Sequence, residues 1–143
     1  MMNTKNSKNS HTKMIHHYLP LFESLSDAYG KVSNDLKWQE FWRTVRLMRS
    51  LLPADDDKYI RVRITDEVPD DRLADTSKTE LYYLIRLNKE KVTNSPELAF
   101  TLLAHEWAHV LTWGTSHPHG DEWGIQMARC WRLISGEVLG GLQ

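Results

Sequence analysis

Residues 95–114 read Ser-Pro-Glu-Leu-Ala-Phe-Thr-Leu-Leu-Ala-His-Glu-Trp-Ala-His-Val-Leu-Thr-Trp-Gly, and this stretch decides the centre of the fold. Serine suits the residue before a helix, proline the first helical position and glycine the helix end, which are the roles open to Ser95, Pro96 and Gly114. Leucine and alanine side chains cover much of the circumference between these ends, as in a helix at the centre of a small domain. The stretch therefore predicts a buried helix from Pro96 to Trp113.

This helix carries the pentad His105-Glu-Trp-Ala-His109, a His-Glu-x-x-His motif. Histidines four positions apart project side by side from a helix, so they can bind the same cation. A catalytic zinc ion has three protein ligands and one open position for water, whose proton a neighbouring carboxylate can accept. We therefore predict zinc-dependent hydrolysis, most simply of a peptide bond, with His105 and His109 as ligands and Glu106 as general base. Histidines hydrogen-bonded in an ordinary core are the alternative.

The third ligand is expected in the irregular stretch after Gly114, because a loop can bring a distant side chain back to a helix-borne metal. Two histidines are available there, His117 and His119. Pro118 stiffens the backbone between them, and Gly120 gives the chain freedom just after the second. We therefore favour His119 as the third zinc ligand and keep His117 as the alternative.

Two motifs together resemble the SprT family of zinc metallopeptidases, which are related to Spartan. They are the pentad at residues 105–109 and His-Gly-Asp-Glu-Trp at residues 119–123, followed by Met127. The resemblance covers about residues 58–134, including the strand-like residues 82–88 that precede the pentad helix. It implies a small zincin-like domain that cleaves protein or peptide substrates.

Carried over position by position, the resemblance makes His105, His109 and His119 the zinc ligands and Glu106 the catalytic base. It also implies an association with DNA-bound proteins. This chain departs from the family in two respects. Its linker between the second and third histidines is shorter than in many relatives, and the cysteine-rich zinc ribbon that often follows the protease domain is missing.

Hydrophobic periodicity and chain breakers predict the other elements. We expect helices over residues 18–29 and 34–51, strands over 58–65 and 80–88, and a loop over 68–78. A last helix should be capped by Asp121 and ended by Gly136, Gly140 and Gly141. The side chains of this helix that form one apolar stripe are more typical of core packing than of substrate binding; they are Trp123, Met127, Trp131 and Ile134. The pattern predicts an α+β fold.

The length of 143 residues and the hydrophobic content of 41% fit one globular domain. Residues 1–17 are expected to form a flexible tail, because the polar composition at the start of the chain cannot bury enough apolar surface. Residues 18–143 are expected to form the single metallopeptidase domain. A single cysteine, Cys130, excludes an intrachain disulfide and suits a reducing compartment. No apolar run approaches 18 residues, so we predict a cytoplasmic protein without membrane contact.

The charge balance bears on possible partners. A formal net charge of −1 argues against strong nonspecific attraction to DNA, which usually shows as an excess of basic residues. Arg43, Arg46 and Arg49 form the one candidate basic patch, although such spacing is more typical of a solvated helix face. Two alternatives to an independent peptidase stay open: a non-enzymatic zinc-containing binding protein, and a protease recruited to DNA-bound proteins. The motif also admits hydrolysis of a substrate other than a peptide.

Overall fold

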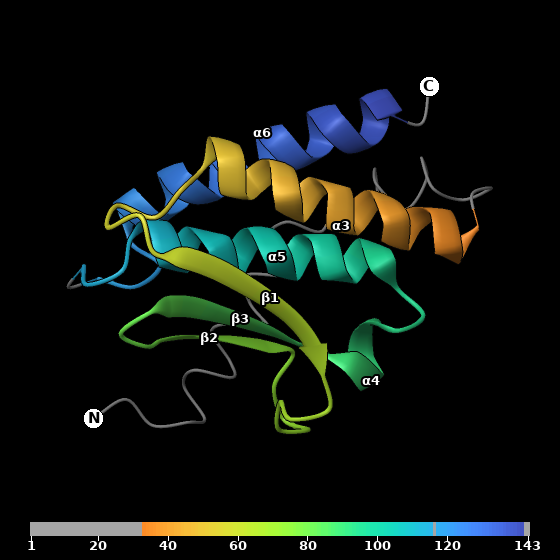
Figure 1. The fold of residues 1–143 in the computed structure, drawn as a ribbon, viewed down its shortest axis with the longest axis horizontal. Coiled ribbons are helices and arrows are strands. Elements are labelled where there is room, and N and C mark those ends of the chain that lie inside the picture. The colour runs from red at the N-terminus through yellow and green to blue at the C-terminus, as the bar shows by residue number, and fades with distance from the viewer. Residues whose placement is uncertain (1–32, 116, 142–143) are drawn as a thin grey trace.

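The computed structural model describes residues 33–115 and 117–141 of the chain. The predicted tail of residues 1–17 and the predicted helix of residues 18–29 lie outside the described residues. Three long helices stack on one face of a small sheet: α3 (Asn34–Leu51), α5 (Pro96–Leu111) and α6 (Asp121–Gly141). As Figure 1 shows, α5 lies between the sheet and the other two helices. The α+β prediction is confirmed.

The central helix α5 forms for the local reasons that its sequence indicates. The hydroxyl of Ser95 accepts a hydrogen bond from the Leu98 amide at 3.3 Å, and Pro96 is the first helical residue. The helix ends at Leu111, two residues before the predicted end, because Thr112 leaves the helical region at φ −116° and ψ 23°. Gly114 then adopts φ +88°, a left-handed conformation that glycine tolerates without strain.

The sheet has three strands in the order β1-β3-β2. Its central strand β3 (Tyr82–Asn88) pairs in parallel with β1 (Tyr59–Thr65) and antiparallel with β2 (Ala74–Lys78). The loop prediction for residues 68–78 is confirmed for residues 68–73 and was wrong for residues 74–78, which form β2. This strand reads Ala-Asp-Thr-Ser-Lys and has almost no apolar signal. Its conformation depends on the hydrogen-bonding edge that β3 offers, which is a tertiary contribution.

The core lies between the sheet and the helices. Alternate residues of β1 and β3, among them Ile60, Val62 and Ile85, are buried. From α6 the predicted apolar stripe is buried as well, which confirms its core role; its members are Trp123, Met127, Trp131 and Ile134. Cys130 is fully buried, and burial raises the pKa of its thiol to about 12, so this side chain is an apolar packing group.

The last helix differs from the prediction at both ends. Asp121 is its first helical residue and not its cap, since the Gly124 amide donates to the Gly120 carbonyl one position earlier. The helix continues through Gly136 to Gly141. A glycine inside a helix costs only about 1 kcal/mol, which the packed stripe before it offsets. Within the described ranges, no helix combines the length and apolar content needed to cross a membrane.

A short helix connects the sheet to the centre of the fold. This helix, α4 (Lys89–Val92), lies between β3 and α5. The side chain of Asn88 caps it by accepting a hydrogen bond from the Lys91 amide at 3.4 Å. The direction of the chain therefore reverses between β3 and α5 within a few residues.

Two of the three arginines in the candidate basic patch on α3 make contacts within the protein. Arg43 binds Glu40 on the same helix, with Nη2 2.6 Å from Oε2. Arg49 donates to the Ile60 carbonyl at 2.7 Å and lies over the ring of Tyr59. The first contact lies within α3 and the second joins α3 to β1. The patch therefore does not present a continuous row of cations to a ligand.

A buried ion pair joins α3 to the start of α5, and it gives a stability prediction. Lys37 Nζ lies 3.0 Å from Glu97 Oε1, and the two side chains are only 10% and 11% exposed. The variant Lys37→Met leaves a buried carboxylate without this cation, so we expect it to lower the free energy of unfolding by about 3 kcal/mol or more. Urea denaturation measures this loss. The double variant Lys37→Met, Glu97→Leu should recover most of the stability; a single variant as stable as wild type would contradict the prediction.

Candidate metal centre

Three imidazoles converge at one point of the structure. The Nε2 atoms of His105 and His109 are 3.2 Å apart, and His119 Nε2 lies 3.2 Å from the first and 2.9 Å from the second. Tetrahedral zinc with bonds of about 2.0 to 2.1 Å holds its nitrogen ligands roughly 3.3 Å apart. The three nitrogens are therefore arranged to hold a metal ion, and they form a metal-ligating cluster among the described residues.

The fold positions these rings from two elements. His105 and His109 lie one turn apart on α5, as the pentad spacing predicts, and His119 comes from the loop before α6. His119 adopts φ +65°, which is uncommon outside glycine and indicates that the loop is held in place by its surroundings. The rival side chain, His117, is exposed and is not part of the cluster. The structure thus brings together the three histidines that the sequence singled out.

Trp123 packs against all three histidine rings. Its ring centroid lies 5.0 Å from that of His105, 5.7 Å from that of His109 and 4.9 Å from that of His119. This indole is 1% exposed and belongs to α6. It limits the rotation of the imidazoles and covers one side of the cluster with apolar surface. The sequence indicated Trp123 as a core residue but not as a neighbour of all three rings.

Glu106 lies beside the histidines in a strongly desolvated environment. Its side chain is 1% exposed, and burial raises the pKa of its carboxyl to about 8. A nearby cation would favour the ionised form, since opposite charge lowers the pKa of a carboxyl group. The hydroxyl of Thr76 donates to Glu106 Oε2 at 3.2 Å. Thr76 belongs to β2, which was predicted as a loop, so no sequence pattern indicated this contact.

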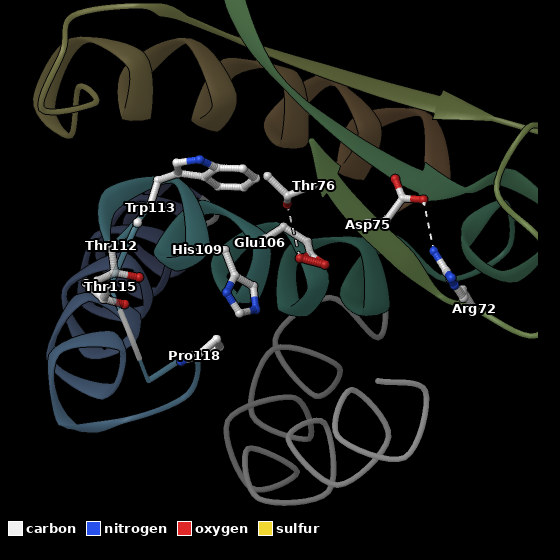
Figure 2. A pocket seen from close by; sticks show the side chains of 10 residues that line it. Arg72, Asp75, Thr76, Glu106, His109, Thr112, Trp113, Thr115 and Pro118 are labelled. Atoms are coloured by element: carbon white, nitrogen blue, oxygen red, sulfur yellow. Dashed lines mark hydrogen bonds and ion pairs between the residues drawn. The ribbon is translucent and has the colours of Figure 1, made fainter. Parts of the chain in front are cut away.

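A cleft of about 350 Å³ opens in front of the centre. Glu106 and His109 form part of its wall, with Trp113 at one end and Arg72 at the other (Figure 2). The remaining lining residues are Asp75, Thr76, Thr112, Gly114, Thr115 and Pro118. The cluster is therefore covered by Trp123 on one side and bordered by an open cleft on another.

Three side chains of β3 and α6 that carry donors suited to stabilising an oxyanion make other contacts. The Tyr83 hydroxyl donates to Asp56 Oδ2 at 3.0 Å, and Tyr82 lies under the guanidinium of Arg61. Arg129 is exposed and donates to Gln126 at 2.9 Å. These three side chains do not line the cleft, so the geometry assigns none of them to this role.

The loop that carries His119 depends on a glycine, which gives a second prediction. A Cβ atom at Gly120 would lie 2.9 Å from the backbone oxygen of His117, so Gly120→Ala must shift the loop backbone. We expect this variant to keep its fold and to bind zinc about tenfold more weakly, as for other changes that disturb ligand orientation. Competition with a chromophoric chelator measures the affinity. Gly124→Ala is the matched control, because no atom lies within 4 Å of its added Cβ; equal affinities for the two variants would contradict the prediction.

No protein-family model matches this chain, and neither a curated protein nor a solved structure does. The resemblance to the SprT family therefore remains a prediction from the two histidine motifs.

Proposed function

We propose that the protein is a SprT-like zinc metallopeptidase with a zincin-like fold. One observation carries the proposal: three imidazole nitrogens 2.9 to 3.2 Å apart lie beside a buried carboxyl group at the wall of a cleft. Neutral imidazole is a preferred zinc ligand, and three such ligands leave one coordination position open. His105, His109 and His119 would hold the ion.

A zinc ion bound there would supply a Lewis acid that lowers the pKa of water to about 7 and polarises a carbonyl group. Glu106 accepts the proton of the attacking water and later passes it to the leaving amide nitrogen. Burial raises the pKa of this carboxyl group, which makes it a stronger proton acceptor than an exposed carboxylate. The Thr76 hydroxyl holds one carboxyl oxygen in place during both transfers.

The position of β2 supports a peptide as the substrate. This strand pairs with β3 along one edge, and its other edge pairs with no strand among the described residues. Two consecutive residues of the strand, Asp75 and Thr76, line the cleft. An exposed strand edge binds extended peptides through main-chain hydrogen bonds. A peptide added to β2 would therefore run past Glu106, to which the strand is already bonded.

The open cleft weighs against a purely structural zinc site. Structural sites usually have four protein ligands and no place for water. Among residues 33–115 and 117–141 the cluster holds three histidines, and the exposed His117 is not among them. This arrangement favours a catalytic role over that of a zinc-containing binding protein.

Metal removal tests the proposal. The zinc-loaded protein is expected to cleave an unfolded, reduced and alkylated protein substrate, and to lose at least about 100-fold in rate after chelation. One equivalent of zinc should restore the activity. Circular dichroism of the metal-free protein checks that the fold survives chelation. Hydrolysis at the same rate in the folded, metal-free protein would contradict the proposal.

A further inference from the structure

One end of the cleft carries a positive charge that the described residues do not neutralise fully. Among the described residues outside the metal centre, the charged side chains that line the cleft are those of Arg72 and Asp75. Arg86 already binds Asp75 through two hydrogen bonds, Nε to Oδ1 at 2.8 Å and Nη2 to Oδ2 at 2.6 Å. Arg72 Nη1 lies 3.9 Å from the same carboxylate, which is too long for a hydrogen bond. Glu67 lies 3.9 Å from Arg86, is mostly exposed and does not line the cleft.

The guanidinium of Arg72 donates no hydrogen bond within the described part of the chain. Its Nε atom is buried and has no hydrogen-bond partner there, and the carboxylate that pairs with Nη1 is 3.9 Å away. A guanidinium presents its N–H donors as a planar fork that matches the two oxygens of a carboxylate. Because its side chain is 33% exposed and lines the cleft while Nε is buried, a ligand bound there can reach the guanidinium through its terminal Nη groups.

The backbone that carries Arg72 is fixed. Its amide donates to the Pro69 carbonyl at 2.9 Å, and its carbonyl accepts a hydrogen bond from Asn88 Nδ2 at 2.8 Å. Asn88 is itself 2% exposed and ends the central strand of the sheet. With the backbone held in this way, only the side-chain rotamers of Arg72 have to be ordered when the guanidinium binds a ligand. Arg72 is therefore a cation on a fixed backbone at one end of the cleft that Glu106 also lines (Figure 2).

We propose that Arg72 binds a carboxylate of the substrate, so that the cleft selects acidic peptides. The inference rests on the proposed peptidase function, because it names the substrate class of the same cleft. The carboxylate is supplied by an aspartate or glutamate side chain near the scissile bond, or by the free C-terminus of a short peptide. Both sources present the same planar anion. Converting the C-terminus to an amide distinguishes them, because it removes only the C-terminal carboxylate.

Binding and cleavage test the proposal separately. Binding is measured with the zinc-loaded Glu106→Gln protein and a series of labelled decapeptides made of alanine and serine. Each peptide of the series carries a single glutamate at a different position. Each peptide has a glutamine counterpart, and each is made as a free acid and as a C-terminal amide. We expect about tenfold tighter binding for one glutamate position over its glutamine counterpart, or for free acids over amides. Fluorescence anisotropy measures the affinities.

Added in this background, Arg72→Ala should abolish the preference, and Arg72→Glu should reverse it toward lysine-containing peptides. Arg72→Lys keeps the charge but loses the fork, so it should retain part of the preference and guards against a folding defect. The matched control is Arg46→Glu, the same charge change at an exposed residue of α3 outside the cleft. It should leave the preference unchanged.

The outcomes separate the two hypotheses. An Arg72-dependent preference for carboxylates in binding, without cleavage by the wild-type protein, would support the inference and remove the peptidase function. Cleavage of glutamate and glutamine peptides at equal rates, with free acids and amides also alike, would overturn the inference while the peptidase function stands. A carboxylate preference that survives in Arg72→Ala would overturn it as well. The inference is also overturned if no peptide binds. Oligothymidylate serves as a second ligand in the same assay, and the inference fails if this ligand binds through Arg72 more tightly than any peptide.

Discussion

Glu106→Gln is expected to lower the rate of peptide hydrolysis by about 10³-fold or more while the protein remains folded and binds one zinc ion. Glutamine has almost the same shape as glutamate, and its amide oxygen can still accept the hydrogen bond from Thr76. It cannot accept the proton of the attacking water. The loss should therefore appear in kcat, with little change in substrate binding.

The same substitution should not destabilise the metal-free protein. Glu106 is 1% exposed, and burial disfavours its charged form, so a neutral amide removes the cost of ionising this group. Metal analysis by mass spectrometry and thermal unfolding check both points. Glu122→Gln is the control, since that carboxyl group is exposed at the start of α6 and should have no effect on the rate. Undiminished hydrolysis in Glu106→Gln with zinc bound would exclude Glu106 as the base.

His119→Ala is expected to weaken zinc binding by more than about 100-fold, beyond the 10- to 100-fold typical of changes around a metal ligand. It removes one of three nitrogens that lie within 3.2 Å of each other. The neighbouring variant His117→Ala removes an exposed imidazole outside the cluster, so its affinity should match that of wild type. Competition with a chromophoric chelator measures all three proteins.

Backbone strain must be separated from ligand loss at this position. His119 adopts φ +65°, which alanine disfavours and asparagine tolerates. His119→Asn should therefore preserve the loop and still lose zinc affinity, because the imidazole is gone. If His117→Ala lost the metal and both His119 variants kept it, the third ligand would be His117 and the loop would have to rearrange on metal binding.

The local chemistry of the chain was sufficient to predict α5 and the arrangement of its side chains. Ser95 and Pro96 start the helix as predicted, and the four-residue spacing places His105 beside His109. These features depend on hydrogen bonds and periodicity within a single helix, which the sequence encodes directly. The identity of Glu106 as the carboxyl group next to this histidine pair follows from the same spacing.

Features that depend on neighbours distant in the chain could not be predicted in this way. Strand β2 has a polar sequence and forms because β3 offers it an edge, so both Thr76 and its contact with Glu106 were missed. The packing of Trp123 on three imidazoles also needs α6 to lie against α5. The high pKa of Glu106 depends on complete burial, which is set by the whole core.

By itself, therefore, the sequence determined the central helix, the pair of histidines on it and the carboxyl group between them, because these depend on interactions within a few residues. The tertiary structure decided that His119 and not His117 joins the pair, and that a polar strand and Arg72 border the cleft. Those outcomes depend on how the loop, sheet and helices pack. Packing energy is shared among residues far apart in the chain and leaves no periodic signal in any one segment.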